Sequence, residues 1–197
     1  MTAKEKKMKV IAICGSPRRE GNTEALLRVA LDVLDERGIG TELITLAGKR
    51  ILPCTACMAC RNAPRCIIED DFDPVFRAML DADGIIVGTP VYFGSATPET
   101  MALLDRAGFV ARHHGNLFAR KVGGPVAVAR RIGQNFTVAQ LLMWFMICGM
   151  IVPGSSYWNI AFGREKGEVL SDAEGLKTIR NFAENIAWLL EKIGAGE

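Results

Sequence analysis

Residues 11–24 read IAICGSPRREGNTE, and the character of the chain changes twice within them. An apolar run breaks at Gly15-Ser16-Pro17, and after Gly21 the apolar residues recur at helical spacing, which predicts a strand, a loop and a helix. Backbone N–H groups and the positive end of a helix dipole converge in such a loop. We therefore expect this loop to hold a phosphate group.

Two common nucleotide-binding patterns do not fit the loop. No Gly-Lys-Ser/Thr follows at the spacing of a P-loop, and Gly-x-Gly-x-x-Gly is absent. An ordinary strand-to-helix turn, with Asn22 or Thr23 as the N-cap, is an alternative that the loop alone leaves open.

Along the rest of the chain, candidate strands alternate with candidate helices. Further strands are expected at 41–46, 85–88 and 122–129, with a fifth beginning at 150–152. Helices are expected at 72–80, from about 98 to 107, in the apolar stretch that leads to 150, and at 171–193, where Ser171 would be the N-cap and Glu174 its capping-box partner.

This alternation predicts an α/β fold with a mostly parallel sheet and helices on both faces. Five strands favour the doubly wound order 2-1-3-4-5, in which a ligand binds outside the carboxyl ends of the first and third strands. The loops 89–94 and 129–134 follow the third and fourth strands, at that same edge. Their exposed rings and backbone N–H groups suit a flat cofactor with a polar edge, although Tyr92 and Phe93 packed under the next helix are an alternative.

A loop from about 49 to 71 carries four of the six cysteines as Cys54-x2-Cys57-x2-Cys60-x5-Cys66. Four thiols in so short a loop can converge on one soft metal centre, and their spacing suits a cubane cluster better than a zinc ribbon with separated pairs. Redox-active thiols, a zinc site or the remnant of a cluster site are the alternatives. The remaining two, Cys14 and Cys148, are expected to be buried.

The first loop, Gly15 to Thr23, resembles the Gly-Ser-x-Arg-x-x-x-Asn-Thr phosphate loop of the flavodoxin-like NADPH-dependent FMN reductase superfamily. This resemblance implies that three segments of the chain together bind one FMN. The implied phosphate residues are Ser16, Arg18, Asn22 and Thr23, with Pro17 and Gly21 beside them. The residues implied at the flavin ring are Pro90, Val91, Tyr92, Phe93 and Gly94. The residues implied at the far side of the ring or at its pyrimidine edge are Ala129, Arg130 and Gln134. The flavin would carry the chemistry, so no catalytic side chain is expected.

The cysteine spacing after the second strand resembles that of the iron–sulfur flavoproteins, which are FMN reductases with one [4Fe-4S] cluster per subunit. The resemblance implies the cluster ligands Cys54, Cys57, Cys60 and Cys66, assembly as a homodimer or homotetramer, and electron transfer from NAD(P)H or a ferredoxin-like donor to an acceptor. A plain FMN reductase without a cluster, a non-enzymatic electron carrier, and a regulatory or metal-sensing module that holds zinc and no flavin are the alternatives.

Length and composition agree with one domain over residues 1–197. A net charge of +2 gives no sign of nucleic-acid binding, and no apolar stretch is long enough to span a membrane. The charged start of the chain, at 1–7, lacks the apolar region of a signal peptide and leads us to expect a cytoplasmic protein. We expect His113 and His114 to lie in a solvated or subunit-facing loop without a role, and Glu69, Asp70, Asp71 and Asp73 to cap the helix at 72.

Overall fold

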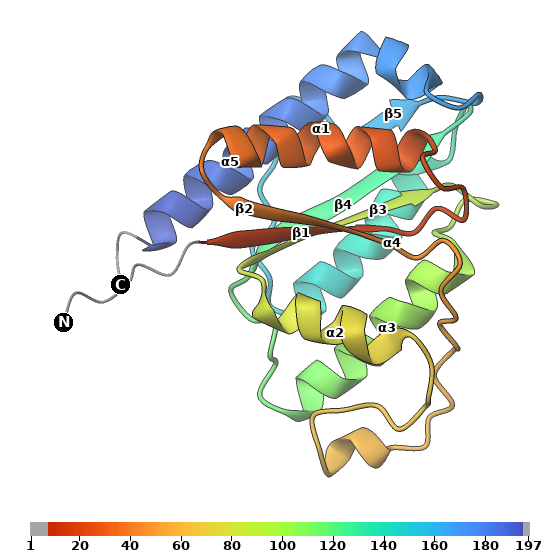
Figure 1. The fold of residues 1–197 in the computed structure, drawn as a ribbon, viewed down its shortest axis with the longest axis vertical. Coiled ribbons are helices and arrows are strands. Elements are labelled where there is room, and N and C mark those ends of the chain that lie inside the picture. Colours follow the sequence, from red (N-terminus) through yellow and green to blue (C-terminus); the bar gives the residue numbers. More distant parts are fainter. Residues whose placement is uncertain (1–7, 195–197) are drawn as a thin grey trace.

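The computed structural model describes residues 8–194, so the charged start at 1–7 and the end of the chain at 195–197 lie outside the described residues. Five strands alternate with five helices along the chain (Figure 1). The strands are β1 (Lys9–Cys14), β2 (Gly40–Thr45), β3 (Gly84–Pro90), β4 (Val122–Ala129) and β5 (Ile160–Phe162). The helices are α1 (Asn22–Glu36), α2 (Phe72–Asp81), α3 (Pro98–His113), α4 (Gln134–Ile147) and α5 (Ala173–Gly194), with short 3₁₀ turns η1 (Ala59–Arg61) and η2 (Glu168–Ser171).

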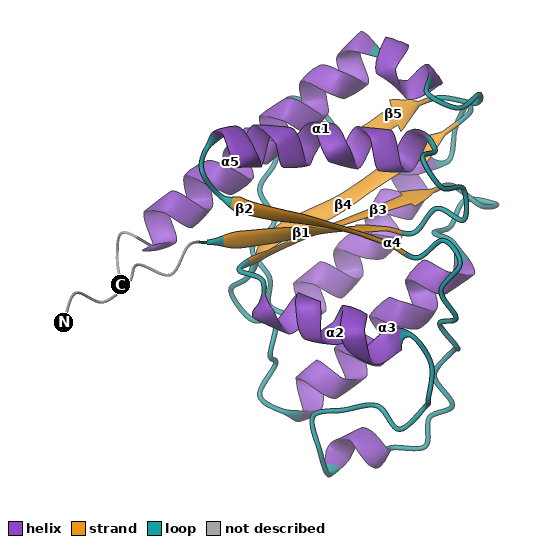
Figure 2. Ribbon diagram, in the orientation of Figure 1, coloured by secondary structure: helices purple, strands orange, loops and turns teal. Residues whose placement is uncertain are grey.

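The sheet has the strand order β2-β1-β3-β4-β5, and all its pairs are parallel. Helices α1 and α5 cover one face, and α2, α3 and α4 cover the other (Figure 2). The doubly wound, flavodoxin-like architecture expected from the sequence is therefore confirmed. Its carboxyl edge brings together the loops after β1, β3, β4 and β5, which positions the site described below.

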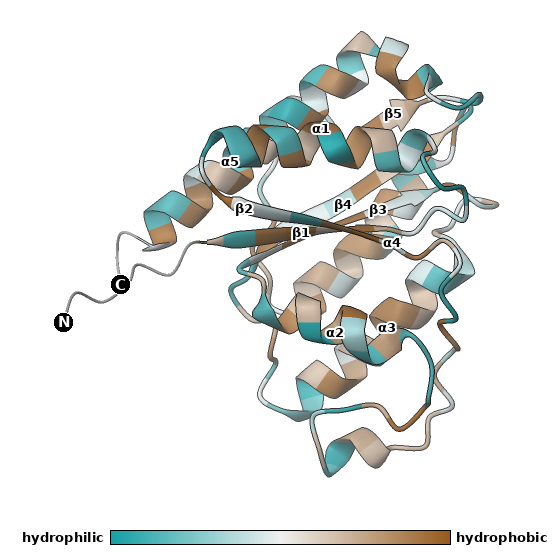
Figure 3. Ribbon diagram, viewed as in Figure 1, coloured by the Kyte–Doolittle hydropathy of each residue, from teal (hydrophilic) through white to brown (hydrophobic). Residues whose placement is uncertain are grey.

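Each face of the sheet has its own apolar core. Along β1, Val10, Ala12 and Cys14 belong to the core under α1 and α5, whereas Ile11 and Ile13 belong to the core under α2, α3 and α4. Successive side chains of a strand point to opposite faces, so a central strand covered on both faces is apolar throughout. Figure 3 shows this in the apolar β1, beside α1 and α5 with alternating apolar and polar residues. Cys14 and Cys148 are fully buried, as expected.

The fifth strand is not where the sequence pattern placed it. Around 150–152 only Ile151 forms an isolated bridge, to Val122, and the strand β5 lies at Ile160–Phe162. Pro153 directly follows residues 150–152, and because proline has no N–H group it cannot continue the hydrogen-bond ladder that Ile151 begins with β4. The chain resumes pairing with β4 only after the intervening loop.

Two helix ends also differ from the expectation. Helix α3 continues through Gly108 to His113. Gly108 packs closely against Trp144 there, since a Cβ would lie 2.9 Å from Trp144 Nε1. Ser171 ends η2 rather than capping α5, and Asp172 takes the capping position by accepting a 2.9 Å hydrogen bond from the Gly175 N–H. The other predicted strands and helices lie close to their expected bounds.

Within residues 8–194, no helix combines the length and the apolar character needed to cross a membrane.

Candidate functional site

The predicted phosphate loop, residues 15–23, which we call the phosphate loop, is held against α3 by a close contact that only a glycine at position 15 permits. A Cβ on Gly15 would lie 1.8 Å from Thr100 Oγ1. The Gly15 N–H donates to the Gly88 carbonyl at 2.8 Å, and its own carbonyl accepts from Thr97 Oγ1 at 2.8 Å. The loop is therefore anchored to β3 and to the start of α3, while the adjoining Ser16 hydroxyl accepts from the Arg18 N–H at 3.2 Å.

Helix α1 begins at the loop with Gly21 as its N-cap, so neither Asn22 nor Thr23 is the N-cap. No side chain of the described residues caps this end of the helix. The first N–H groups of a helix need acceptors, and the helix dipole favours a negative one. This helix end is thus suited to a phosphate group.

The segment after β5 lies across the phosphate loop. Asn22 Nδ2 donates to the Glu165 carbonyl at 2.8 Å, and Arg18 Nη1 donates to the Arg164 carbonyl at 3.5 Å. A Cβ on Gly163 would meet Asn22 Nδ2 at 2.7 Å. The Asn22 side chain, which the resemblance assigns to the phosphate, is therefore also a tie between the loop and this segment.

The loop after β3 presents its aromatic residues outward. Tyr92 and Ser95 exchange two backbone hydrogen bonds, of 2.8 and 3.0 Å, around Phe93 and Gly94, which have φ values of 52° and 82°. Positive φ at both central residues is the conformation of a type I′ turn. Tyr92 is 43% exposed and Phe93 fully exposed, so the two rings do not pack beneath the next helix.

The loop after β4 contributes through its first residues only. Ala129 and Arg130 face the same space as the phosphate loop. Gln134 instead begins α4, is buried, and points toward β5, where its Nε2 lies 3.4 Å from the Ala161 carbonyl.

These loops enclose what we call the edge cleft, with about 750 Å³ of empty space that includes open solvent. Nine of the predicted FMN residues line it: Ser16, Arg18, Asn22, Thr23, Pro90, Val91, Tyr92, Ala129 and Arg130. Five others do not: Pro17, Gly21, Phe93, Gly94 and Gln134. Arg18, Arg130 and Arg164 give the cleft three guanidinium groups, and none of its lining residues is acidic. Arginine forks recognise phosphate well, so this residue set fits a phosphorylated cofactor.

Sequence reasoning missed Gly163 and Arg164, which line the cleft. Both directly follow β5, and the misplacement of that strand hid the fact that their loop reaches the same edge. Had the strand been assigned to 160–162, their position after it would have identified them.

A second depression, the cysteine hollow, lies under the loop between β2 and α2. Cys54, Cys57, Cys60 and Cys66 all line it, together with Met58, Ile67, Arg106, Phe109, Val110 and neighbouring loop residues, and its empty space of about 390 Å³ includes open solvent. Burial, and beyond it the proximity of the other three cysteines, raises the pKa of Cys60. No group of three His, Cys, Asp or Glu side chains among residues 8–194 is arranged to hold a single metal ion. Each thiolate of a four-iron cluster binds a different iron, so its ligands lie further apart than those of one ion.

Comparison with known proteins identifies the family. Residues 8–165 match the family model described as NADPH-dependent FMN reductase. The chain belongs to the NADPH-dependent FMN reductase family. It is therefore an FMN-binding flavoprotein and an FMN-dependent oxidoreductase, as the sequence predicted.

Curated relatives of this family member agree with that assignment, and a solved structure of another protein shares its fold. The chain is 41% identical to the iron-sulfur flavoprotein MJ1083 of Methanocaldococcus jannaschii, over 94% of this chain and 99% of the relative. It is 36% identical to an iron-sulfur flavoprotein of Methanosarcina thermophila, over 94% of this chain and 97% of the relative. The structure of RosB with a bound 8-demethyl-8-formylriboflavin-5'-phosphate superposes with a TM-score of 0.77 at 17% identity, covering 95% of this chain and 81% of that one, which shows the shared fold.

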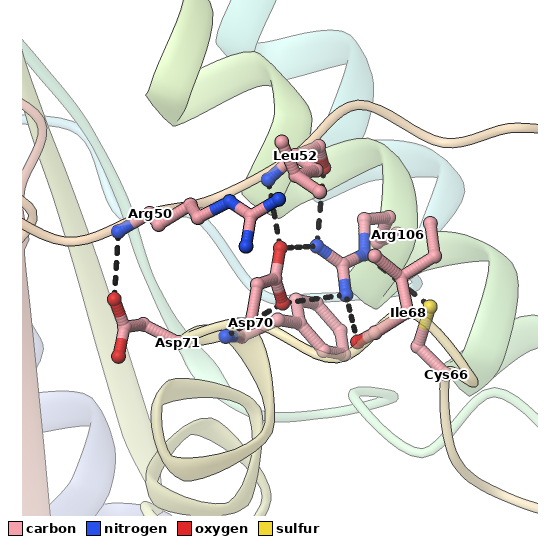
Figure 4. Close-up of polar contacts among 8 residues, drawn as sticks. Arg50, Leu52, Cys66, Ile68, Asp70, Asp71 and Arg106 are labelled. Atoms are coloured by element: carbon pink, nitrogen blue, oxygen red, sulfur yellow. Dashed lines mark hydrogen bonds and ion pairs between the residues drawn. The ribbon is translucent and has the colours of Figure 1, made fainter.

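Beneath the cysteines of this FMN reductase family member lies a buried ion pair that sequence reasoning did not find. Asp70 accepts from Arg106 Nη1 at 2.6 Å and from Nη2 at 3.0 Å (Figure 4). Burial alone would raise the pKa of Asp70, but hydrogen bonds from Arg106 and from the Leu52 and Phe72 N–H groups hold that pKa below its ordinary value. Burial likewise opposes the charge of Arg106, yet the bonds to Asp70 and Cys66 raise its pKa. Both side chains are therefore charged at neutral pH.

The acidic run before α2 thus does more than cap that helix. Asp70 does accept from the Phe72 N–H at 3.1 Å, but it mainly pairs with Arg106. Asp71 accepts from the Arg50 N–H, and Asp73 forms an exposed ion pair with Arg77. Asp71 occupies the N-cap position of α2 without making a side-chain cap hydrogen bond, and Asp73 lies in the first turn, so Asp70 is the one of these residues that accepts from an N–H group at the start of the helix.

The histidines also differ from the expectation. His113 is the last residue of α3 rather than part of a loop. His114 Nε2 lies 2.7 Å from the Cys60 carbonyl and so contacts the cysteine loop, a contact that adjacent histidines in a sequence give no sign of.

Proposed function

We propose that this chain is an iron–sulfur flavoprotein that passes electrons between a reduced donor and an acceptor through FMN and a [4Fe-4S] cluster. The observation that carries the proposal is that Cys54, Cys57, Cys60 and Cys66 all line the one cysteine hollow. Relatives that align with nearly the whole chain are named iron-sulfur flavoproteins, which supports it. The proposed unit is a single domain over residues 1–197 with the cysteine loop at about 49–71.

In this proposal the edge cleft binds FMN. Ser16, Arg18 and Thr23 contact the phosphate together with Arg164 and the first N–H groups of α1, while Asn22 ties the loop to the segment after β5. Pro90, Val91 and Tyr92 lie against the ring, and Ala129 and Arg130 lie at its far side. The flavin supplies the hydride or electron transfer, and the protein holds it in place.

The cysteine loop binds the cluster through its four thiolates, and the cluster supplies one-electron transfer. Thiolate ligands must stay reduced, and the described cysteines are all free thiols. We therefore also propose a cytoplasmic location, where thiols stay reduced. No second nucleotide-binding pattern is present in the sequence, so a nicotinamide donor would stack directly on the flavin. A ferredoxin-like protein is the alternative donor.

The exposed apolar side chains of α4 support the proposed homodimer or homotetramer. Phe136, Met143, Met146 and Ile147 are each more than half exposed. Soluble chains rarely leave such a set open to water, and a second subunit would cover it.

A plain FMN reductase without a cluster is the second candidate, because the family model that matches residues 8–165 is described as NADPH-dependent FMN reductase. Anaerobic purification followed by iron, acid-labile sulfide and flavin analysis separates the two. We expect about four irons per chain, lost on Cys57→Ala and kept in the control Thr55→Ala in the same loop. Flavin without iron, even after reconstitution with iron and sulfide, would leave the plain reductase.

A further inference from the structure

The Arg106 side chain lines the cysteine hollow and is 1% exposed, and the side chain of its partner Asp70 is fully buried. All five of its N–H groups are used. Nη1 donates to the Leu52 carbonyl at 3.1 Å and to Asp70, Nη2 donates to the Ile68 carbonyl at 3.3 Å and to Asp70, and Nε donates to Cys66 Sγ at 3.3 Å (Figure 4). Arginine has five such donors and no acceptor, so its capacity is filled.

These bonds join the two ends of the cysteine loop. Leu52 comes two residues before Cys54, whereas Ile68 and Asp70 come just after Cys66. Arg106 itself sits on α3, stacked 4.1 Å from the centre of the Phe72 ring. A rigid helix therefore holds both ends of the loop that carries the four cysteines.

The fifth donor makes Cys66 different from the other cysteines. Cys54 and Cys57 are exposed, and no described side chain donates a hydrogen bond to them or to Cys60. Only Cys66 receives an N–H group from a buried guanidinium. A charged donor of this kind stabilises negative charge on sulfur.

We propose that Arg106 is a positioning residue that fixes Cys66 as a cluster ligand and raises the reduction potential of the cluster. This inference rests on the proposed function. One-electron reduction adds negative charge to a cluster, and an N–H···S bond or a nearby positive charge stabilises the reduced form. Asp70 has the opposite effect on the potential, because its carboxylate offsets the charge of Arg106.

A purely structural ion pair would behave differently. Loss of either partner would then loosen the loop in the same way, and any change in potential would have the same sign in both variants. Tuning by charge instead predicts opposite signs for the two partners, which separates the two roles.

The test is an anaerobic spectroelectrochemical titration of the cluster in the full chain. We expect a lower potential in Arg106→Gln, a higher potential in Asp70→Asn, and no shift in the control Arg77→Gln, which removes an exposed arginine from an Arg–Asp pair. Arg106→Lys keeps the ion pair without the directed Nε donor and takes the place of Arg106→Gln if that variant fails to fold. Its expected potential lies below that of the wild type.

Two outcomes would overturn the inference. Equal potentials in the wild type and the Arg106 variant, or shifts of the same sign in the Arg106 and Asp70 variants, would leave a structural pair only, with the cluster itself intact. A wild-type chain that holds no iron after reconstitution is a different failure, because it removes the proposed function and the inference together.

Discussion

The edge cleft and the cysteine hollow lie along one helix and are built in different ways. Helix α3 starts against the phosphate loop, where Thr97 bonds to Gly15, and passes the hollow at Arg106, about 12 Å further along its axis. The cleft is made by backbone at the edge of a sheet, with a glycine locked in place by close contacts. The hollow is made by a loop with one short 3₁₀ turn, held at its base by side chains.

The difference corresponds to what FMN and the proposed cluster need. A phosphate is bound by N–H groups and arginines in fixed positions, which sheet topology supplies. A cluster needs four thiolates that an adaptable loop can bring to it, and the loop needs only a firm base. The two regions should therefore respond to different substitutions.

The largest effect is expected from Asp70→Ala, which leaves the Arg106 charge buried without its partner. Removing one member of a buried ion pair costs about 3 kcal/mol or more of unfolding free energy. The cysteine loop should exchange its amide hydrogens faster and lose iron, while FMN stays bound to the folded chain. Chemical denaturation, hydrogen exchange and cofactor analysis measure these changes.

Asp73→Ala is the matched control, since its ion pair with Arg77 is exposed. Its expected cost is below about 1 kcal/mol. Equal costs for the two aspartates would show that the base of the loop does not depend on the buried pair.

A smaller effect, confined to the edge cleft, is expected from Gly15→Ala. Its Cβ would overlap Thr100 Oγ1, and relieving such overlap costs about 2 kcal/mol. The shifted phosphate loop should lose FMN while the cysteine loop keeps its iron. Gly154→Ala, where a Cβ would meet nothing within 4 Å, should change neither. Retention of FMN by the Gly15 variant would contradict the assignment of this loop.

Arg164→Ala tests whether a single arginine of the cleft contributes to FMN binding. Arg164 lines the cleft and is proposed to contact the phosphate, so its loss should weaken FMN binding about tenfold, or about 1.4 kcal/mol. The effect should diminish at high salt, because screening weakens charge attraction. Arg131→Ala, next to the cleft but outside its lining, is the control in the same flavin titration. Equal losses from both arginines would indicate general charge rather than a specific contact.

The smallest expected effect is the pH dependence of the contribution that Asp70 makes to the free energy of unfolding. The pKa of Asp70 is lowered in the folded chain, so its contribution to stability is complete above the ordinary aspartate pKa of about 4 and is lost as pH falls through the lowered value. The stability difference between wild type and Asp70→Asn should therefore shrink on acidification. A difference that stays constant down to the acid unfolding of the chain would argue against a charged pair.

The edge cleft could be predicted from the sequence more completely than the cysteine hollow. Strands such as 85–88 are apolar throughout, and alternation with helices predicts the order of the sheet, so three loops were assigned to one edge correctly. The fifth strand was misplaced because Ile151 begins a pairing that Pro153 prevents from continuing, and Arg164 was missed with it.

The base of the hollow was not predictable in the same way. Arg106 and Asp70 are 36 residues apart, and neither belongs to a pattern that marks it. An acidic residue before a helix usually caps it, so Asp70 carried a local explanation that concealed its main partner. Such pairs depend on how α3 packs against the loop, which local sequence does not encode.

The proposed function requires two redox centres in one chain. An anaerobic reductive titration that counts electrons per chain detects both centres at once. FMN accepts two electrons and a [4Fe-4S] cluster one, so we expect about three electrons per chain. Two electrons per flavin-loaded chain, unchanged after reconstitution with iron and sulfide, would contradict it.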